Sequence, residues 1–400
     1  MENSSTSLEE SKVNRLQSFI NEEVAISDSN IDEELPGSSS DSGENEPVIN
    51  PAEEIIQASM RHIGEQSVQL KTPKPVNICW VQEPLNDPSV KSKLKLFAIT
   101  WNMFGKPPPD DISLLFPKRV DHHLIIVCTQ ECLRSIGTSL FYSSKKPWEL
   151  KLKESLGNNY ELYAANTIGA THLAIFMNIN LKGLISGPVL KKVSTGFGNV
   201  VKNKGAVGVQ FTVGKTSLLI VGCHLASGQN AVSKRNNDFR RIEKELFKEI
   251  STEPASELFD AVIYLGDLNY RVNGRKEDVE FLVELDIMEP LRKGDQLSNE
   301  LAQNTAFAGF CEGKITFDPT YKYDIGTSTF DTSKKQRVPS WTDRILFKSR
   351  NSKLKQKTYG SLTESFTSDH RPVFSQFILN FQPGKDPVNK SSNSRTCLVF

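Results

Sequence analysis

The chain has 400 residues, enough for one large domain or two ordinary ones, and its 48 basic and 48 acidic residues balance to a net charge of zero. The charge is unevenly spread: residues 1–54 hold fourteen acidic residues against Lys12 and Arg15, so they carry −12 and the remainder carries +12. A basic body suits an anionic partner (an anionic lipid, a soluble polyphosphate, a nucleic acid or a membrane surface), although many basic proteins merely have a solvated basic face.

The six cysteines are scattered and give no sign of a metal site or a disulfide scaffold. No pair has the CxxC spacing of a zinc site, so we expect a reducing, intracellular compartment. The N-terminus is acidic and has no apolar run of the kind that a signal peptide needs. No stretch of about 18 apolar residues occurs, so we expect no membrane-spanning helix.

Composition divides the chain into three regions. Residues 1–75 are rich in Ser, Glu, Asp and Asn and lack a sustained apolar period, so we expect a disordered acidic region. Pro73 and Pro75 mark the approach to a folded domain, which we expect over residues 91–382. Residues 383–400 are rich in Ser, Asn and Lys and are expected to form a flexible tail.

The body of the chain has the pattern of a strand-rich domain. Residues 94–101 alternate between two faces, as a strand does, and residues 124–130 form the continuous apolar run of a strand buried on both faces. Apolar residues recur at helical spacing over 231–250. The other predicted elements are strands at 160–166, 171–179, 206–213, 216–224, 260–267, 344–349 and 373–381, a short helix at 277–288, and a polar, loop-like segment at 305–339.

Polar side chains follow several of these strands where the apolar run stops. In YLGDLNYRV, Asp267 and Asn269 lie two apart at the end of a buried strand, so both can point to one face. A carboxylate beside a carboxamide is able to accept a proton from water and to hydrogen-bond a phosphoryl oxygen. A polar turn is the alternative, and these two residues alone do not separate the readings. The other polar strand ends are Asn102, Glu131, His224, Asp343 and Asp369 with His370, and together such a set indicates one chemical site.

Three segments resemble signature sequences of the inositol polyphosphate 5-phosphatases: GDLNYR at 266–271, PSWTDRIL at 339–346 and SDHRPV at 368–373. Further matches follow the family's order along the chain: WNMFGK at 101–106, TQE at 129–131, GNVVKNKGAV at 198–207, HLASGQ at 224–229, RNNDF at 235–239, FDPTYKYD at 317–324 and DTSKKQR at 331–337. The resemblance covers about residues 91–382. It implies a DNase-I-like α+β fold, a four-layer sandwich of two packed mixed β-sheets flanked by helices.

The resemblance also implies a magnesium-dependent phosphoric monoester hydrolase in which water attacks phosphorus directly. Glu131 matches the Mg²⁺ ligand, with Asn102 and Asp369 in the metal and water shell, which suits an ion that prefers oxygen ligands and keeps several waters. Asp267 matches the base that orients and deprotonates the attacking water. Asn269 matches a donor to a non-bridging phosphoryl oxygen.

Two histidines complete the implied catalytic set. His370 matches a residue that binds the scissile phosphate, its ring oriented by Asp343, and His224 matches a further donor to phosphate. Phosphoryl transfer needs positioning and charge neutralisation more than covalent chemistry, and these groups supply both. Cys223 is not a candidate nucleophile, because no phosphate-cradling glycine loop with an arginine follows it.

Substrate choice is expected to depend on basic groups beyond the metal. Lys204, Tyr323, Lys335 and Arg337 match family positions that contact the phosphate next to the scissile one. A solvated basic loop is the alternative for any single lysine, but the surrounding motif favours the substrate contact. Arg344 is a further candidate, able either to contact phosphate or to pair with a carboxylate, and the second role is favoured.

A glycine-rich segment carries Phe197, Val200 and Val201 beside Lys202 and Lys204. Exposed apolar residues next to lysines would suit an enzyme that dips into a bilayer. Inward packing of the same residues is an equal alternative, so the segment predicts a membrane contact only if these side chains face outward.

The chain ends in Cys397-Leu-Val-Phe, which fits a CaaX prenylation box whose terminal Phe favours geranylgeranylation, although so short a match can arise by chance. One prenyl group gives only reversible anchoring, so Lys385, Lys390 and Arg395, or the basic body, would supply a second signal. We therefore expect a cytoplasmic protein held peripherally on the cytosolic face of a membrane.

The combined reading is a prenylated, intracellular phosphoinositide 5-phosphatase. Its expected substrate is phosphatidylinositol 4,5-bisphosphate, with the 3,4,5-trisphosphate as a second candidate. The alternatives are an enzyme of soluble inositol polyphosphates, a DNase-like nuclease, and a catalytically silent membrane adaptor. KYD and DTSKKQR disfavour the nuclease, so no nucleic-acid partner is expected, and the filled catalytic positions disfavour the adaptor. The sequence indicates no particular protein partner.

Overall fold

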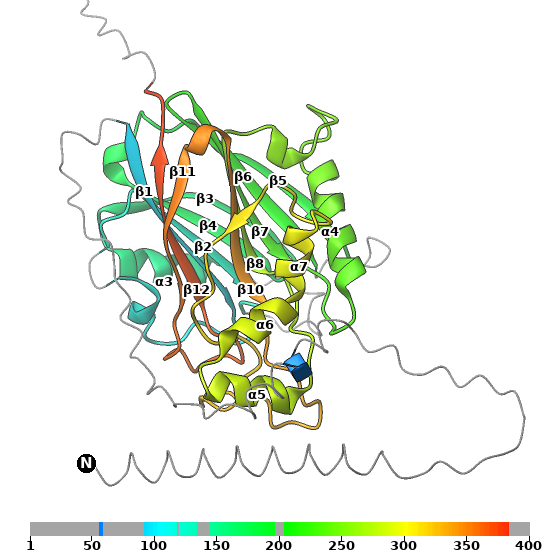
Figure 1. The fold of residues 1–400 in the computed structure, drawn as a ribbon. Helices are drawn as coiled ribbons and strands as arrows, with labels where there is room; N and C mark the ends of the chain where they lie inside the picture. The colour runs from blue at the N-terminus through cyan, green and yellow to red at the C-terminus, as the bar shows by residue number, and fades with distance from the viewer. Residues whose placement is uncertain (1–55, 59–91, 118–119, 134–143, 197–203, 384–400) are drawn as a thin grey trace, which may run out of the picture.

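The computed structural model describes residues 56–58, 92–117, 120–133, 144–196 and 204–383 (Figure 1). The predictions for Phe197, Val200, Val201 and Cys397, and for most of the acidic region and the tail, lie outside the described residues. None of the helices within these ranges has the length and apolar character needed to cross a lipid bilayer.

The first sheet has six strands in the order β11-β12-β1-β2-β4-β3. β1 and β2 are parallel, and the other neighbouring pairs in this sheet are antiparallel. Every residue of β2 is buried, as its continuous apolar run predicts. The strand bounds are β1 Lys93–Asn102, β2 Leu124–Gln130, β3 Tyr160–Ile168, β4 Thr171–Asn178, β11 Leu354–Ser361 and β12 Val373–Asn380.

The second sheet also has six strands, in the order β5-β6-β7-β8-β10-β9. Its one parallel pair is β7 with β8, so each sheet combines a parallel pair with antiparallel neighbours. Every residue of β8 is buried. The strand bounds are β5 Val189–Ser194, β6 Gly205–Val213, β7 Thr216–His224, β8 Ala261–Asp267, β9 Cys311–Glu312 and β10 Asp343–Ser349.

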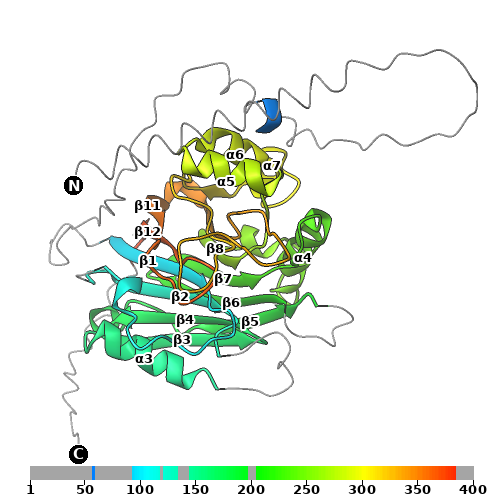
Figure 2. The same cartoon turned by 90° about the horizontal axis from the view of Figure 1, so that it is seen from below.

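The sheets pack face to face, and each carries a helix on its outer side, which makes four layers (Figures 1 and 2). Alternate residues of β1 divide between layers: Leu96 and Ala98 join the core between the sheets, whereas Phe97 faces outward toward α3 (Lys146–Leu156). Trp148 and Leu152 of α3 complete that outer cluster. The predicted sandwich of two mixed sheets flanked by helices is therefore confirmed.

The second sheet is covered by α4 (Val232–Glu245), whose residues Phe239 and Ile242 pack on Leu219 and Tyr264. Three further helices follow β8 in the chain and lie next to one another (Figure 2). Their bounds are α5 Lys276–Glu284, α6 Met288–Gly294 and α7 Gln296–Ala302; the short 3-10 helices are Ser113–Leu115, Ile179–Leu181, Ala255–Glu257 and Arg350–Ser352.

Periodicity missed helices α3, α6 and α7 and two edge strands of the sandwich. β5 and β11 pair with only one neighbour each and carry VLKKVS and LKQKTYGS, so their lysines hide the alternation that marks a half-buried strand. The predicted helix over 231–250 is shorter, ending at Glu245. The segment 305–339 is loop-like as predicted, apart from the two-residue β9.

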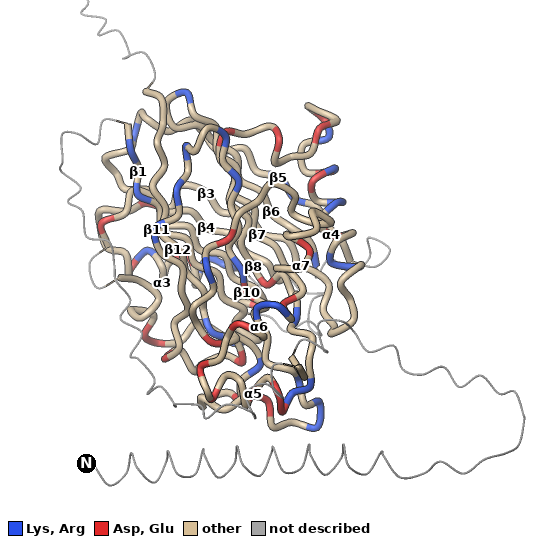
Figure 3. The backbone as a smooth tube through the Cα atoms, in the orientation of Figure 1, with Lys and Arg blue, Asp and Glu red and all other residues tan. Residues whose placement is uncertain are grey.

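Charged residues of both signs are interspersed over the described chain (Figure 3). Many of them are paired: Lys353 Nζ contacts Asp260 Oδ1 at 2.6 Å, and Lys276 Nζ contacts Glu280 Oε1 at 3.0 Å. Such exposed or half-exposed pairs contribute little to the free energy of unfolding. In the view of Figure 3, basic and acidic residues therefore occur side by side along the described chain.

Two neighbouring histidines are buried at the N-terminal end of β2, His122 against Phe97 and His123 accepting a bond from the Lys95 backbone at 2.9 Å. Burial lowers the pKa of each to about 4, against about 6.5 when unfolded. The unfolded state therefore binds more protons between these values. We expect the free energy of unfolding to fall as the pH drops from 6.5 to 4, by up to about 1.4 kcal/mol per pH unit for each histidine.

Urea unfolding at pH 7, 6 and 5 measures this slope. His122→Phe removes one of the two groups and keeps an aromatic ring beside Phe97, so its slope should be shallower than that of the wild type. An equal slope in both proteins would show that His122 does not contribute to acid sensitivity.

Residues 56–58 differ from the expectation of disorder for residues 1–75. They form a turn of helix, and Ile56 is fully buried at 0% exposure in the cluster that contains Val272 and Val279. The pair Ile55-Ile56 in an acidic, polar segment carries no periodic signal, so the burial of Ile56 could not be predicted from local pattern.

Candidate active site

The polar strand ends meet at one end of the sandwich. Strand register places His224 of β7 and Asp343 of β10 on either side of Asp267 of β8. In the other sheet, Asn102 ends β1, and its Nδ2 donates to Asp267 Oδ2 at 3.0 Å and to Glu131 Oε1 at 3.4 Å. The Asn102 side chain thus joins the two sheets at the site.

Glycine is required where β8 approaches this junction. Gly266 has φ +151°, and a Cβ there would lie 2.0 Å from the carbonyl oxygen of Cys223 on β7. The chain then turns sharply, with Asn269 in the left-handed region at φ 59°. The close approach of β7 and β8 sets the spacing of the two polar residues that end them, His224 and Asp267.

Asp267 lies at the centre of the site and is 2% exposed. Its Oδ2 lies 3.2 Å from His224 Nε2, and its Oδ1 accepts from the backbone N–H of Asn269 at 3.1 Å. Burial by itself raises the pKa of Asp267, but the contact with His224 and the positive charges of His370 and Lys204 outweigh it and hold the pKa well below its usual range. A carboxylate this acidic orients a water molecule better than it deprotonates one.

Glu131 follows β2 directly, with φ 56° and its backbone N–H donating to Ala170 at 2.9 Å. Its side chain is 14% exposed, and its Oε1 lies 4.0 Å from His224 Nε2. Within the described ranges, no three His, Cys, Asp or Glu side chains converge tightly enough to form a metal site by themselves. An accessible carboxylate next to the Asn102 carboxamide instead fits an ion that retains most of its water.

Asp369 lies beside the Nε2 edge of the His370 ring, with its Oδ1 3.9 Å from that nitrogen. Burial raises its pKa above the usual range, and the charge of Glu131 adds to that effect. Ser368 fixes the backbone here, because its hydroxyl donates to the Asn102 carbonyl at 2.6 Å. Asp369, Glu131 and Asn102 are therefore neighbours, as the predicted metal and water shell requires.

Lys204 and His224 form a directly hydrogen-bonded pair through Nζ and Nε2. Burial and the Lys204 charge lower the pKa of His224, whereas burial lowers the pKa of Lys204 to about 8 against the opposing charges of Asp267 and Glu131. At neutral pH, His224 is neutral and Lys204 is largely cationic. The Lys204 ammonium group thus faces the carboxylates of Asp267 and Glu131 beside the predicted phosphate position.

His370 and Asp343 form a buried pair with the Nδ1 of the ring 2.7 Å from Oδ2 of the carboxylate. Thr320 and Thr342 donate to the same oxygen at 3.0 and 2.9 Å. Burial lowers the pKa of His370, but the Asp343 carboxylate and the other acidic groups nearby raise it to about 10. The ring is therefore an imidazolium at neutral pH, with Nε2 available to an anion, as the predicted phosphate contact requires.

Arg271 and Tyr321 belong to the site but were missing from the sequence prediction. Arg271 Nη2 donates to Asn269 Oδ1 at 2.7 Å, and Asn269 Nδ2 donates to the Leu225 carbonyl at 3.1 Å. The guanidinium lies 4.5 Å from the Tyr321 ring centre, and that ring lies 4.5 Å from the ring of His370. Arg271 binds the oxygen of the Asn269 carboxamide and so fixes the orientation of this group. One of its two N–H bonds is used by the Leu225 carbonyl, and the other remains for a ligand. Both residues lie within the matched motifs, GDLNYR and FDPTYKYD, which was the available signal.

Tyr323, the predicted substrate contact, has its hydroxyl turned inward. It donates to the Pro319 carbonyl at 2.8 Å, and the Arg371 guanidinium covers its ring at 3.9 Å. Burial raises its pKa well above the usual range. The ring of Tyr321, which contacts His370, is the phenol placed at the site.

Arg344 is held by two carboxylates inside the protein. Its side chain is completely buried and donates to both oxygens of Glu312, at 2.7 and 2.6 Å, and to both oxygens of Asp295, each at 3.0 Å. These charge-assisted bonds leave no donor directed at the site. The substrate prediction for Arg344 is wrong, and its alternative, pairing with a carboxylate, is correct.

Lys335 and Arg337 lie on the loop before β10, Lys335 exposed and Arg337 half-buried. The loop is held by Asp331, which accepts from the backbone N–H of Arg337 at 2.9 Å and from Lys322 Nζ at 3.0 Å. Among the residues described here, neither Lys335 nor Arg337 has an acidic side-chain partner. Both charges therefore remain available to an anionic ligand.

Comparison with known proteins adds a family to this geometry. Residues 99–376 match the model of the endonuclease/exonuclease/phosphatase family 2. A type IV inositol polyphosphate 5-phosphatase of Arabidopsis thaliana is 30% identical over 338 residues, covering 83% of this chain and 93% of that protein. The chain belongs to the inositol polyphosphate 5-phosphatase family.

Two further matches agree with this assignment to the 5-phosphatases. A phosphatidylinositol polyphosphate 5-phosphatase type IV of Rattus norvegicus is 34% identical over 312 residues, covering 74% of this chain and 47% of the relative, so the chain spans about half the length of that protein. The 5-phosphatase domain of a synaptojanin, solved with inositol (1,4)-bisphosphate and calcium, superposes with a TM-score of 0.66 at 28% identity, covering 83% of this chain and 91% of that one.

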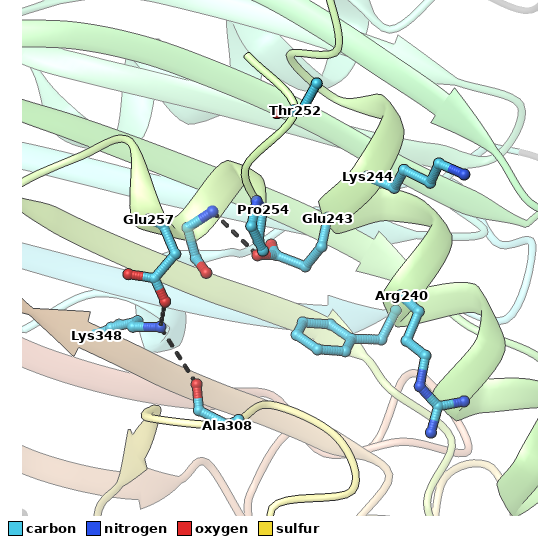
Figure 4. Close-up of a pocket in the computed structure, with 10 residues that line it drawn as sticks. Arg240, Glu243, Lys244, Thr252, Pro254, Glu257, Ala308 and Lys348 are labelled. Carbon is cyan, nitrogen blue, oxygen red and sulfur yellow. Dashed lines mark hydrogen bonds and ion pairs between the residues drawn. The ribbon is translucent and has the colours of Figure 1, made fainter.

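A separate cavity of about 270 Å³ lies on the outer side of the second sheet, between α4 and the loop before β9 (Figure 4). Its buried acid, Glu243, accepts from the Ser256 backbone at 3.0 Å, and Lys348 contacts both Glu257 and the Ala308 carbonyl. The cavity shares no residue with the strand-end site. Its internal polar groups are already paired, so it does not contribute to the predicted chemistry.

Proposed function

We propose that the protein is a phosphoinositide 5-phosphatase that hydrolyses the 5-phosphate of phosphatidylinositol 4,5-bisphosphate, with the 3,4,5-trisphosphate as a second candidate substrate. The observation that carries the proposal is the meeting, in a member of this family, of an acidic Asp267 carboxylate with the charged His370–Asp343 pair. One group suits an attacking water, and the other suits the oxygens of a phosphate.

Each side chain then has a role that follows from its charge. Asp267 orients the water, and the His370 imidazolium and the free N–H of Asn269 bind phosphoryl oxygens. Lys204 adds a positive charge, and the Nε2 of neutral His224 accepts from its ammonium group and lies 3.2 Å from Asp267 Oδ2. Direct attack by water needs no protein nucleophile, and the buried Cys223, whose pKa burial raises well above its usual value, does not offer one.

Magnesium is the proposed cofactor, with Glu131, Asn102 and Asp369 as the residues that would hold it and its waters. Bound there, Mg²⁺ would neutralise charge on the reacting phosphate. An oxygen-donor set with one accessible carboxylate supports a hard cation, and the solved synaptojanin domain contains calcium. The Nδ2 of Asn102 faces both Glu131 and Asp267, so this side chain couples the ion-binding side to the water-orienting side.

Selectivity for a second phosphate is assigned to Lys204, Lys335 and Arg337, with Tyr321 in place of Tyr323 as the phenol. Lys204 directly precedes β6, and Lys335 and Arg337 lie in the loop before β10, where both lack an acidic partner within the described part of the chain; all three cations are assigned to a ring substituent beside the scissile phosphate. The inositol (1,4)-bisphosphate in the synaptojanin domain keeps a 4-phosphate and has no 5-phosphate, which is consistent with this arrangement.

Lys335→Ala tests the second-phosphate contact. We expect KM for phosphatidylinositol 4,5-bisphosphate to rise about tenfold with kcat nearly unchanged, because one charge-assisted bond made equally in the ground and transition states is lost. Lys334→Ala removes the neighbouring exposed lysine and should leave KM unchanged. Equal KM values for the two variants would remove Lys335 from the substrate site.

Membrane contact is proposed for Phe197, Val200 and Val201, beside Lys202 and Lys204 in the sequence. Three described residues support an apolar rim: Phe104 and Ile325 are each 43% exposed, and Phe366 is 37% exposed. Phe104 donates its backbone N–H to Asn102 Oδ1 and so borders the strand-end site, and Gly326 donates to the Phe366 carbonyl, which brings Ile325 close to Phe366. Replacing Phe197 with Asp should weaken binding to vesicles that contain phosphatidylinositol 4,5-bisphosphate; unchanged binding would remove the segment from the interface.

Prenylation at Cys397 is proposed to hold the protein on the cytosolic face of a membrane. We expect Cys397→Ser to move most of the protein from the membrane fraction to the soluble fraction of cells, because stable anchoring needs two signals and the basic residues alone supply only one. Cys311→Ser replaces an exposed cysteine elsewhere and should leave the distribution unchanged. Identical distributions for the two variants would contradict the anchor.

Phosphate release in Mg²⁺ tests the function itself, with Asp267→Asn as the blank. Short-chain phosphatidylinositol 4,5-bisphosphate is compared with soluble inositol 1,4,5-trisphosphate, and cleavage of duplex DNA is measured beside them. Preference for the lipid supports the proposal, and preference for the soluble compound supports the alternative 5-phosphatase. Release from neither, without DNA cleavage, would favour a membrane adaptor that keeps the fold.

A further inference from the structure

Ile56 is an isolated contact between the N-terminal part of the chain and the folded body. It belongs to the three described residues of one helical turn, and the next described range begins at Ser92. Its side chain is nevertheless completely buried, in the same cluster as Val272 and Val279. Burial of an isoleucine so far along the sequence from its partners is a tertiary contact and not a local one.

Two glycines create the space that Ile56 fills. A Cβ at Gly274 would lie 2.9 Å from Ile56 Cδ1, and a Cβ at Gly294 would lie 3.1 Å from the same atom. Both distances are shorter than ordinary van der Waals contact, so a side chain at either glycine would compete with the isoleucine. Val279 and Val272 complete the walls, 3.2 and 3.5 Å from those two Cβ positions.

Gly274, Gly294, Val272 and Val279 form a socket for Ile56. This socket includes part of the loop that leaves the candidate active site. Three successive backbone N–H groups hold this loop: Arg271 donates to Gln296 Oε1 at 2.9 Å, Val272 to Ser340 Oγ at 3.0 Å, and Asn273 to the Gly294 carbonyl at 2.9 Å. Asn273 therefore bonds to one socket glycine and precedes the other. Movement of the socket would shift the backbone that carries Arg271.

We propose that Ile56 is an anchor through which the N-terminal segment becomes part of the catalytic unit, and that it positions the loop of residues 269–274. The partner of the socket is thus a segment of this same chain, recognised by one aliphatic side chain. Because Arg271 orients the Asn269 carboxamide, the anchor reaches the site through backbone placement and contacts no reacting group. Its effect on turnover rests on the proposed function; the anchor itself does not.

The test compares Ile56→Ala with Ile56→Val and with Ile250→Ala, all in the full chain. Ile250 is 65% exposed, so the same truncation there removes no buried contact. We expect Ile56→Ala to lower Tm by about 4 to 10 °C, the range for a buried isoleucine truncated in a domain of this size. Hydrogen exchange at the amides of Arg271, Val272 and Asn273 should quicken at least tenfold. Ile56→Val should change the Tm and the exchange rates much less, and Ile250→Ala should change neither quantity.

A double-mutant cycle with Gly294→Ala tests the contact directly. The added methyl group collides with Ile56 in the wild type but not in Ile56→Ala, whereas its 3.0 Å approach to the Asn273 carbonyl is common to both. The Tm loss caused by Gly294→Ala should therefore be smaller in the Ile56→Ala background.

Identical Tm values for Ile56→Ala and Ile250→Ala would overturn the anchor. A lower Tm without faster exchange at the three amides would overturn the positioning role. Neither measurement uses phosphate release, so failure of the proposed phosphatase activity is distinguishable from failure of the anchor.

Discussion

Asp267→Asn is expected to lower kcat by a factor of about 10² to 10⁴ with phosphatidylinositol 4,5-bisphosphate as substrate, because the carboxylate that orients the attacking water is lost. The substitution keeps the shape and removes the charge. In the wild type, Asp267 Oδ2 faces Asn102 Nδ2 and His224 Nε2. A carboxamide in its place can keep only part of these contacts. Steady-state phosphate release measures the effect.

Asp260→Asn is the matched control for Asp267→Asn. Asp260 directly precedes β8 at its opposite end, where it pairs with Lys353 and Ser217. Its replacement should leave kcat within about twofold of the wild type, because it lies outside the site. If Asp267→Asn retained turnover within a few-fold of this control, the assigned role of Asp267 would be wrong.

Asp343→Asn is expected to lower activity about 10- to 100-fold, as loss of a group that orients a functional histidine usually does. The loss of activity should become larger as the pH rises. The Asp343 carboxylate is the chief influence that raises the pKa of His370 to about 10 against burial. Without it, burial prevails and the pKa falls toward or below the ordinary 6.5. The wild-type ring stays charged between pH 6.5 and about 10, whereas the variant ring is neutral there. A pH–rate profile from 6 to 9 measures the difference.

Stability gives a second readout of the same pair. A histidine whose pKa is raised in the folded state stabilises fully below the unfolded pKa, and this contribution is lost as the pH rises from about 6.5 to about 10. The wild type should therefore lose free energy of unfolding across that window, and Asp343→Asn should lose less. Asp278→Asn, at a buried aspartate paired with Arg275, is the control that should keep the wild-type slope. A pH–rate profile for Asp343→Asn parallel to that of the wild type would refute the pairing role.

The chemistry of the site was predictable from the sequence because it depends on which residue types end which strands. A strand with both faces buried must be apolar until it reaches solvent, so Asp267 and His224 stand out as the first polar groups after long apolar runs, and Glu131 ends another such run. The sandwich of two sheets followed from the family resemblance, with which these strands are compatible. The edge strands β5 and β11 were not predictable, because a strand with one neighbour and a solvated face can carry lysine at almost any position.

Only the tertiary structure decided which side chains face one another. Tyr321 and Tyr323 share a loop motif, and the structure directs the first toward His370 and the second into a bond with Pro319. Arg344 follows Asp343 directly, but alternate residues of a strand point to opposite faces, so Arg344 meets Glu312 while Asp343 meets His370.

The sequence by itself determined the residue types, their order and the strands that carry them. The crossing contact from Asn102 to Asp267 and the burial of Ile56 depended on folding, because each joins residues more than 160 positions apart. Local periodicity reports only whether a residue faces the core or solvent. Which distant residue it meets there is set by the packing of the two sheets and of the loops at their ends.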